Sequence, residues 1–502
     1  MINISAQPFS VYFAWQLEVQ LHNFSKHGIV KECIHVLFSY DPEIGIPKEL
    51  NYFTNKNRLL AEFFCYPDLR SNVSYTSSIR PHILKQHFAK FEYLGHETIF
   101  YHDSDMLFSR RLNIKDELHN ATCYVSDTRN YLDVSYIRAS SSEELLDNML
   151  DVVGLEKRKL LHEDSQTGGA QYILKGINSS YWGKVEKDSE NLYVLMNAYN
   201  KRCWEEEYAI KKEYRSKKRG IQAWCADMWA VLWNLWLLDK KVEIHPEMDF
   251  SWPFDSIADW KKKAIHHYSG NIKDRTKHFK KTEYLNYPPW YDDDLVEIDH
   301  DTCSYKITEL IQSHRQRLDD ERPIYSKSCV IFKQEALTDR ALEKYLIFKK
   351  YLQKHLALDV FIIAKNEHDS DQYLNQQTLV NKVVYNDYSE VILMSLNCCI
   401  DYATVEEIFN RTEESDGFFY PTTLYKVDEL FIETFAKVLD MELFYVNQGK
   451  FNMQADATKR GLFYFRLPPD VESKCKVLET YMSNAPKYEM AQKSLNVAFN
   501  FL

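Results

Sequence analysis

The 502-residue sequence predicts an α/β protein with helices on both faces of a mostly parallel sheet. Short runs rich in β-branched and aromatic residues alternate with segments of ten or more residues whose apolar positions recur at helical spacing. Such alternation is typical of a doubly wound sheet. Acidic residues follow directly after one of these apolar runs, and doubly wound sheets bind their ligands at the carboxyl ends of strands.

The N-terminal half supplies most of these elements. The run at residues 9–14 predicts a first strand, and the helix after it is expected to end at Gly28. A second strand is expected from Ile34 to Tyr40. A further helix is expected to end at Gly95, immediately before a strand from Thr98 to Tyr101.

A change of composition predicts a second domain. A segment rich in Pro, Tyr and Asp separates the first elements from a later polar stretch, so we expect domains at residues 1–315 and 316–502. In the second domain, strands at 328–332 and 360–364 flank a helix at 337–356, which again indicates α/β structure. Acceptor recognition is the role expected for this domain.

Charge and cysteine usage narrow the class of protein. The 62 Lys and Arg against 73 Asp and Glu give a net charge of −11, which argues against nonspecific wrapping of nucleic acid. The ten cysteines form no C-x-x-C pair, which favours reduced thiols. The start of the sequence lacks a signal-peptide pattern, and no apolar run of about 18 residues occurs, so we expect a cytoplasmic protein without a transmembrane segment.

The first chemical motif is Asp103-Ser104-Asp105, at the end of the predicted strand 98–101. Paired carboxylates supply the hard oxygen ligands that Mg²⁺ or Mn²⁺ prefers when it also holds phosphates. A D-x-D taken alone is also typical of a solvated turn. Haloacid dehalogenase phosphatases use a similar motif with Thr four residues after the first Asp, and Leu107 stands there in this sequence, which disfavours that class.

The second motif is His267-x-x-Gly270-x-x-Lys273. An imidazole can complete a metal site, glycine lets a backbone amide approach an anion, and lysine can neutralise a diphosphate. A single histidine is more often packed in the core or solvated. Its combination with the D-x-D favours a metal-bound diphosphate held from two sides.

Taken together, these motifs resemble those of glycosyltransferases of the GT-A fold, which bind Mn²⁺ and a nucleotide diphosphate-sugar. The sequence looks most like the plant hydroxyproline O-arabinosyltransferases and peptidyl-serine galactosyltransferases. The matching stretches are Trp15-Gln16, Arg80-Pro81, Gly168-Gly169-Ala170-Gln171-Tyr172, Trp224-Cys225-Ala226-Asp227-Met228-Trp229 and His245-Pro246-Glu247-Met248-Asp249-Phe250. The resemblance covers about residues 9–290 and does not extend past about 300. The plant enzymes carry a membrane anchor that this sequence lacks, so their acceptor does not carry over.

The resemblance implies a metal-dependent glycosyltransferase that moves a pentose or hexose from a UDP-linked donor to an acceptor hydroxyl with retention of configuration. It implies Mn²⁺ or Mg²⁺ bound by Asp103, Asp105 and His267, with Asp105 and Asp227 as catalytic residues. It also implies a set of donor-binding residues, namely Trp15, Gln16, Arg80, Asp103, Ser104, Gly168, Gly169, Gly270 and Lys273. The residues by themselves do not fix the stereochemistry.

Two further segments are expected at the same site. Gly168 and Gly169 are expected just before a helix, either offering exposed amides to the donor or forming a helix-entry turn. Asp227 lies between Trp224 and Trp229 at the start of a predicted helix. Its carboxylate would either accept the proton of the acceptor hydroxyl or serve only as a negative charge that the helix dipole stabilises at the N-terminus. The tryptophans are expected in the core rather than as platforms for sugars.

The acceptor remains open between a glycan, a protein and a nucleic acid. Basic stretches at residues 211–220 and 261–281 are typical of solvated loops, but they would also suit an anionic acceptor such as a lipid diphosphate, a phosphorylated glycan or DNA. The tetrapeptide at 368–371 repeats that at 102–105 without a later histidine-glycine motif, so no second active site is expected. The alternative function is a non-catalytic protein that binds nucleotide sugars or carbohydrates on a degenerate GT-A scaffold.

Overall fold

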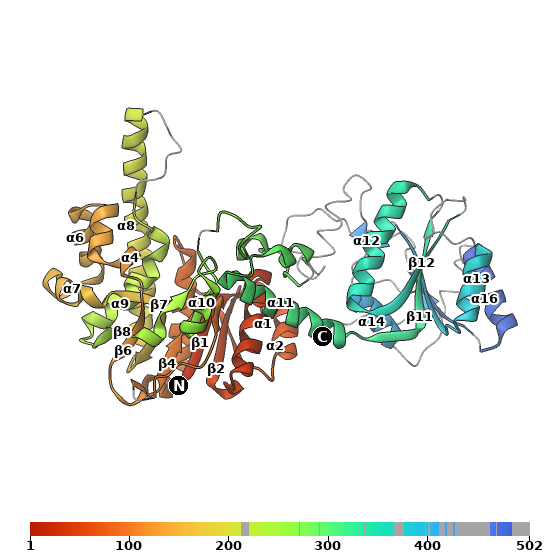
Figure 1. The fold of residues 1–502 in the computed structure, drawn as a ribbon, viewed down its shortest axis with the longest axis horizontal. Coiled ribbons are helices and arrows are strands. Elements are labelled where there is room, and N and C mark those ends of the chain that lie inside the picture. The colour runs from red at the N-terminus through yellow and green to blue at the C-terminus, as the bar shows by residue number, and fades with distance from the viewer. Residues whose placement is uncertain are drawn as a thin grey trace. The chain divides into compact units, whose positions relative to one another are not determined.

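The computed structural model forms two compact units. The first comprises Met1–Leu285 and Pro289–Gln312, and the second comprises Asn286–Pro288 and Ser313–Leu502 (Figure 1). The described residues are 1–115, 117–211, 220–270, 272–290, 292–334, 337–364, 376–396, 398–399, 402–410, 417–418, 425–426, 462–467 and 469–483. The repeated tetrapeptide at 368–371 and most of the basic stretch at 211–220 lie outside them.

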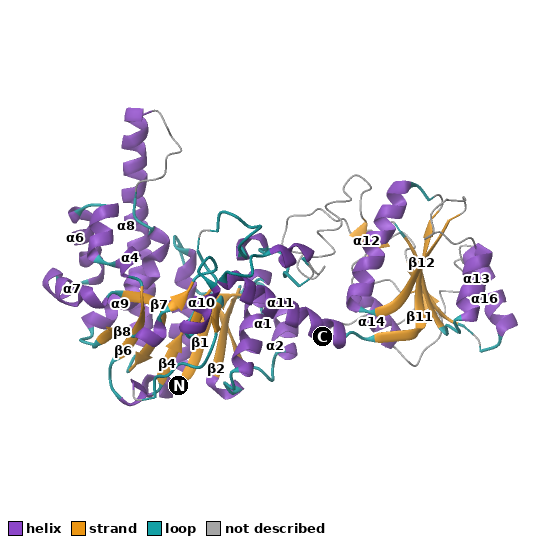
Figure 2. Ribbon diagram, viewed as in Figure 1, coloured by secondary structure: helices purple, strands orange, loops and turns teal. Residues whose placement is uncertain are grey.

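A seven-stranded sheet with the strand order β3-β2-β1-β4-β7-β6-β8 forms the centre of the first unit. Its strands are β1 (Ile2–Pro8), β2 (Ile34–Tyr40), β3 (Glu62–Pro67), β4 (Thr98–Tyr101), β6 (Cys123–Asp127), β7 (Gly168–Lys175) and β8 (Val242–Ile244). Most neighbouring strands are parallel, whereas β7 runs antiparallel to both β4 and β6 (Figure 2). The mostly parallel sheet predicted from the sequence is confirmed.

Helices cover both faces of this sheet because side chains alternate along each strand. On β2, Leu37 joins a hydrophobic cluster with α3, α6, α8 and α9, whereas Val36 and Phe38 join another cluster with α1 and α2. The helices of the unit are α1 (Val11–Lys26), α2 (Lys48–Lys56), α3 (Ile79–Lys90), α4 (Arg129–Leu132), α5 (Val134–Ser140), α6 (Glu143–Val153), α7 (Lys157–Glu163), α8 (Ser179–Lys211), α9 (Ala226–Leu237) and α10 (Ile257–Lys262).

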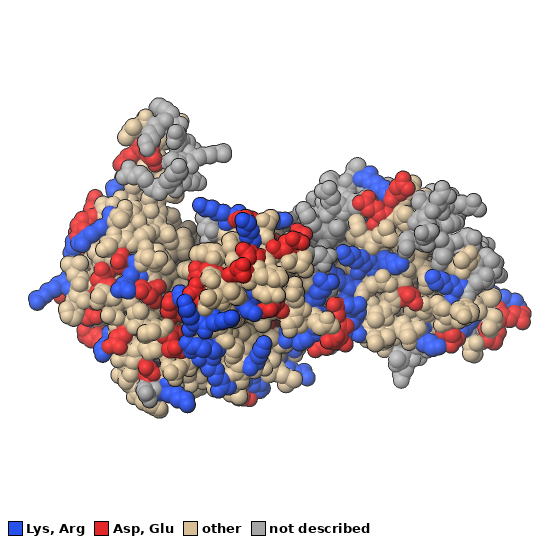
Figure 3. Space-filling model, in the orientation of Figure 1, with Lys and Arg blue, Asp and Glu red and all other residues tan. Residues whose placement is uncertain are grey.

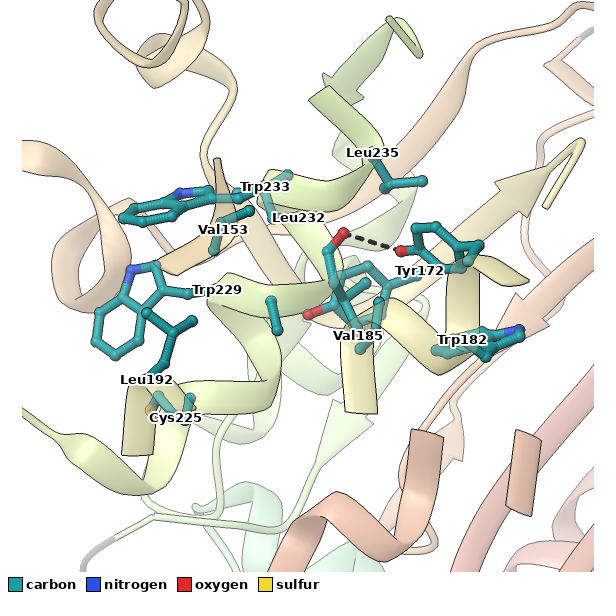
Figure 4. Close-up of a cluster of buried hydrophobic side chains, with 14 of the residues drawn as sticks. Val153, Tyr172, Trp182, Val185, Leu192, Cys225, Trp229, Leu232, Trp233 and Leu235 are labelled. Atoms are coloured by element: carbon teal, nitrogen blue, oxygen red, sulfur yellow. Dashed lines mark hydrogen bonds between the residues drawn. The ribbon is translucent and has the colours of Figure 1, made fainter. Parts of the chain in front are cut away.

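The helix α9 carries three of the four tryptophans of the first cluster. Figure 4 shows Trp229 and Trp233 of α9 together with Val153 of α6 and Leu192 of α8. The indole N–H of Trp229 donates to the carbonyl oxygen of Leu132 over 2.9 Å, so even this buried ring has its polar atom paired. These contacts hold α9 in position over the sheet.

The predicted first strand is wrong in position. The strand β1 ends at Pro8, and most of the run at 9–14 belongs to α1. The side chain of Ser10 caps this helix by accepting a hydrogen bond from the backbone N–H of Phe13 over 3.5 Å. The capped helix therefore takes the apolar residues after Ser10 that the sequence pattern assigns to a strand.

The described part of the second unit is also α/β, as predicted. Its five-stranded sheet has the order β12-β11-β13-β17-β15, and a separate pair joins β14 and β16. The strands are β11 (Ile324–Gln334), β12 (Ala357–Ala364), β13 (Glu390–Ser395), β14 (Cys398–Cys399), β15 (Gly417–Phe418), β16 (Tyr425–Lys426) and β17 (Leu462–Arg466). The helices are α12 (Asp339–His355), α13 (Gln376–Tyr385), α14 (Tyr402–Asn410) and α16 (Val471–Ser483). Clusters on the two faces of the sheet involve α12 on one side and α13 with α16 on the other.

Helix α11 (Cys303–Asp320) begins in the first unit and ends in the second, and the boundary predicted at 315–316 lies within it. Within the described ranges, no helix is both long and apolar enough to cross a membrane. On the face drawn in Figure 3, acidic and basic side chains are interspersed rather than segregated, despite the net charge of −11.

Two histidines and a tyrosine form a buried chain between β2, β3 and α3. His35 Nδ1 lies 3.0 Å from His87 Nε2, and the Tyr66 hydroxyl lies 2.7 Å from His87 Nδ1. Burial lowers the pKa of His35 to about 4. Burial, together with the neighbouring His35 and Lys90, lowers the pKa of His87 to about 3. Both rings are therefore neutral in the folded protein at neutral pH.

This pair makes the free energy of unfolding depend on pH. Because both folded pKa values lie below the ordinary 6.5, the unfolded chain takes up protons that the folded one does not. Stability should be fully present above pH 6.5 and fall as the pH drops towards 4, by up to about 1.4 kcal/mol per pH unit for each histidine. Urea denaturation at several pH values measures this slope. His87→Gln should give a shallower slope, and a slope equal to that of wild type would contradict the assignment. The exposed control His162→Gln should keep the wild-type slope.

Candidate active site

A three-stranded sheet brings the two sequence motifs together. Strand β5 (Met106–Phe108) follows the D-x-D directly, and β10 (Ile265–His267) pairs with it in antiparallel register, with β9 (Phe250–Ser251) parallel on the other side of β10. In this register His267 is the partner of Met106. The strand pairing thus sets the histidine beside the two carboxylates, although some 160 residues separate them in the sequence.

Asp103, Asp105 and His267 form a candidate metal site. His267 Nε2 lies 3.3 Å from Asp105 Oδ1 and 3.6 Å from Asp103 Oδ2. One ligand atom from each of the three residues lies within 4.8 Å of those of the other two. Two carboxylates and one imidazole are a donor set that suits Mn²⁺ or Mg²⁺, so the residues present fit the cation that the resemblance implies.

Two cationic side chains also contact these carboxylates. Arg80 Nη1 lies 2.7 Å from Asp103 Oδ1, and the ammonium of Lys281 forms an ion pair with Asp105 Oδ2. Burial by itself would raise the pKa of Asp105, but the nearby Lys281 and His267 outweigh it and hold the pKa well below its ordinary value. The carboxyl group of Asp105 is therefore ionised.

Asp227 is connected to this cluster through Arg80. It lies in the first turn of α9, where its Oδ2 is 3.6 Å from Arg80 Nη1 and its Oδ1 is 2.7 Å from the hydroxyl of Tyr75. Burial raises the pKa of Asp227, whereas Arg80 and the hydrogen bond from Tyr75 oppose that rise. Arg80 thus links a carboxylate at the metal site with a second carboxylate on α9.

These groups line one cavity of about 660 Å³. That volume falls within the range of small-molecule sites in proteins. Of the residues predicted from the sequence, the cavity lining includes Gln16, Arg80, Asp103, Ser104, Asp105, Asp227, His267 and Gly270. At Gly270 the φ angle is +103°, a backbone conformation that residues with a Cβ rarely adopt, so glycine suits this position.

Trp15 and Lys273 are placed elsewhere. Trp15 is buried, and its indole N–H donates to the carbonyl oxygen of Tyr284 over 3.0 Å. Its ring packs against those of Tyr268, Phe279, Tyr284 and Trp290. Lys273 is exposed and does not line the cavity. Lys281, which belongs to the second basic stretch, lines it instead.

Gly168 and Gly169 lie at the start of β7, so the expectation that they precede a helix is wrong. The pairing between β6 and β7 shifts register here, and the two backbones approach closely. A Cβ at Gly168 would lie 2.3 Å from the Val125 side chain, and one at Gly169 would lie 2.6 Å from the Tyr172 hydroxyl. The pair therefore has a packing reason to be glycine. The next residue, Ala170, lines the cavity.

Aromatic side chains at the cavity include some that the sequence does not single out. Trp224 is 63 % exposed and lines the cavity, against the expectation that the tryptophans of this segment lie in the core. Trp229 does lie in the core. Trp252 also lines the cavity, with its ring stacked on that of His267 at 5.7 Å and on that of the half-exposed Phe254 at 6.2 Å.

The geometry predicts which substitutions weaken cation binding. With UDP present, Asp105→Asn and His267→Gln should each raise the dissociation constant for Mn²⁺ about tenfold or more, because each removes a ligand. Electron paramagnetic resonance of free Mn²⁺ measures this constant. The exposed Asp274, which bonds only locally to Thr276, gives the matched control Asp274→Asn. Unchanged Mn²⁺ binding in the first two variants would contradict the site.

Comparisons with known proteins do not assign the chain to a family. No protein-family model matches the sequence, and no curated protein matches it. Among solved structures, the apo bifunctional glycosyltransferase WbbM is similar at 11 % identity and a TM-score of 0.32, over 62 % of this chain and 52 % of WbbM. The galactosyltransferase LgtC, in complex with donor and acceptor sugar analogues, is similar at 15 % identity and a TM-score of 0.29, over 62 % of this chain and 96 % of LgtC. The glycosyltransferase GlyE of Streptococcus pneumoniae TIGR4 is similar at 10 % identity and a TM-score of 0.27, over 76 % of this chain and 83 % of GlyE.

Proposed function

We propose that the first unit is a metal-dependent glycosyltransferase that moves a sugar from a UDP-sugar to an acceptor hydroxyl. The observation that carries this proposal is the convergence of Asp103, Asp105 and His267 in one cavity with Arg80 and Asp227. The lining of this cavity of about 660 Å³ includes these three candidate metal ligands and, on α9, the further carboxylate of Asp227. A nucleotide sugar needs both, because its diphosphate and its reacting carbon are different parts of one ligand.

The diphosphate end of the donor belongs at the metal site. Asp103, Asp105 and His267 would hold Mn²⁺ or Mg²⁺, which when bound supplies stabilisation of the negative charge on the departing diphosphate. Arg80 keeps the carboxylate of Asp103 in place through its 2.7 Å contact. Gln16 supports the same turn, since its side-chain oxygen lies 3.3 Å from the hydroxyl of Ser104.

Asp227 is proposed as the second catalytic carboxylate. Its pKa is raised by burial, which makes it a stronger proton acceptor than an exposed aspartate. In the cavity it would either take the proton of the acceptor hydroxyl or stabilise positive charge on the sugar ring. Tyr75 and Arg80 hold its two oxygens, so the orientation of the carboxylate is fixed before substrate binds. The UDP donor and the retaining course remain proposals that rest on the family resemblance.

A glycan is the acceptor class that the cavity favours over a protein or a nucleic acid. Trp224 is exposed at the cavity. Trp252, which also lines the cavity, stacks on the ring of Phe254. Exposed aromatic surface beside polar groups marks a ligand site, and the apolar face of a sugar ring packs well on such a surface. In the basic stretch at 261–281, Lys263 and Lys280 pair with Asp249 and Glu283, so their charges are matched locally.

A donor screen tests the catalytic proposal against the alternative of a non-catalytic binding protein. Wild-type protein with Mn²⁺ should release UDP from at least one UDP-sugar. Asp105→Ala should lower the rate about a hundredfold or more, because metal stabilisation of the leaving group is worth several kcal/mol. A chelator should have the same effect, whereas Asp274→Ala should leave the rate unchanged. Activity that survives Asp105→Ala would refute the mechanism, and binding of UDP without turnover of any donor would favour the binding protein.

The acceptor proposal predicts a selective defect in Trp224→Ala. Transfer to the best acceptor from an oligosaccharide panel, measured by mass spectrometry, should fall about tenfold or more in kcat/KM, because a stacking surface worth more than about 1 kcal/mol is lost. Hydrolysis of the donor by water should stay within twofold of wild type. The exposed Tyr93, which does not line the cavity, gives the control Tyr93→Ala. An equal loss of transfer and hydrolysis would contradict a role in acceptor binding.

A further inference from the structure

Lys281 occupies an unusual place for a lysine. It begins the short 3-10 turn at Lys281–Glu283, yet its side chain is only 18 % exposed and its ammonium contacts Asp105 Oδ2. The same ammonium lies 5.7 Å from the centre of the Tyr12 ring. A lysine charge is costly to remove from water unless a partner compensates it. Asp105, with a side chain 5 % exposed, is that partner.

This ion pair completes a closed set of contacts around the D-x-D. The two oxygens of Asp103 face Arg80 and His267, and the two oxygens of Asp105 face His267 and Lys281. Two carboxylates are thus balanced by one guanidinium and one ammonium. A divalent cation that binds the same oxygens brings two further positive charges to this cluster, so one of the positive groups has to move away from those oxygens.

Lys281 is the group suited to leave. Arg80 is held on α3 by Asp103 and reaches Asp227 as well, so its departure would break contacts with both carboxylates. The ammonium of Lys281 pairs with one carboxylate oxygen at the end of a flexible four-carbon side chain. Once its ion pair with Asp105 is broken, the ammonium of Lys281 is an uncompensated positive charge on a side chain that is only 18 % exposed. A diphosphate in the adjoining cavity supplies the negative charge that it then lacks.

We propose that Lys281 is an exchangeable counter-ion that couples the binding of the cation to that of the donor diphosphate. Without donor, Lys281 neutralises Asp105 and weakens binding of the free cation. With donor, Lys281 transfers to the diphosphate and frees Asp105. The inference rests on the proposed function, and by thermodynamic linkage each ligand must strengthen the other by the same factor.

Calorimetric titrations of the full chain test this coupling. Mn²⁺ is titrated with and without UDP, and UDP with and without Mn²⁺, into wild type, Lys281→Gln, Lys281→Arg and Lys280→Gln. In wild type, UDP should tighten Mn²⁺ binding about tenfold or more. In Lys281→Gln, Mn²⁺ alone should bind about tenfold more tightly than in wild type. The enhancement of Mn²⁺ binding by UDP should be about threefold or more smaller than in wild type, with the remainder coming from the direct attraction between cation and diphosphate. Lys281→Arg should retain most of the coupling because it keeps the charge.

Lys280→Gln is the matched control, because it removes a neighbouring ammonium that pairs with Glu283 instead. It should behave as wild type. Equal Mn²⁺ affinity of wild type and Lys281→Gln without UDP would overturn the inference while leaving the glycosyltransferase proposal intact. UDP binding that is independent of Mn²⁺ would also overturn it, since Lys281 would then serve as a permanent cation. Failure of wild type to bind both Mn²⁺ and UDP would refute the proposed function together with the inference.

Discussion

The pairing of β10 with β5 is the constraint on which the candidate site depends. The D-x-D turn is local in sequence and needs only the end of a strand, but its third partner comes from a distant part of the chain. Antiparallel pairing in a single register places His267 opposite Met106, and a hydrogen bond from the backbone N–H of Tyr268 to the carbonyl oxygen of Asp105 continues it. A shift by one residue would turn the histidine to the other face of the small sheet.

Electrostatic balance is the second requirement of the site. The carboxylates of Asp103 and Asp105 repel each other at one turn, and the charges of Arg80 and Lys281 compensate them from two different elements. His267 contacts both carboxylates from a third element. The same arrangement makes the site responsive, since a ligand that adds charge has to exchange with one of these groups. Asp227 belongs to this balance because Arg80 also pairs with it, so the carboxylate on α9 and the candidate metal site share one guanidinium.

Sequence patterns predicted the parts of the fold in which local and tertiary preferences agree. The strands at Ile34–Tyr40 and Thr98–Tyr101 were found because their apolar runs are buried on both faces. The sequence pattern did not predict strand β1 because this strand carries buried polar residues. The side chains of Asn3 and Gln7 donate to the carbonyl oxygens of Cys33 and Leu37, and such compensation by other parts of the chain leaves no periodic signal.

The candidate site shows a similar division. The D-x-D and the histidine motif were recognisable because residue type and spacing carry their chemistry. Which lysine of the basic stretch enters the cavity depends on the path of the chain after β10, and spacing alone pointed to Lys273 rather than Lys281. Trp224 is 63 % exposed and Trp229 is fully buried, although only five positions separate them in the sequence. Only the packing of α9 against the sheet decides which ring faces the cavity.

The contacts of the Trp15 indole determine how short a fragment that keeps the candidate site intact can be. Its hydrogen bond to Tyr284 and its contacts with Phe279 and Trp290 tie the first helix to a segment that extends beyond both sequence motifs. Lys281 lies inside that tied segment. A fragment that stops after the histidine motif would keep Asp103, Asp105 and His267, yet it would leave an uncovered aromatic surface on α1 and would lose Lys281 from the cavity lining.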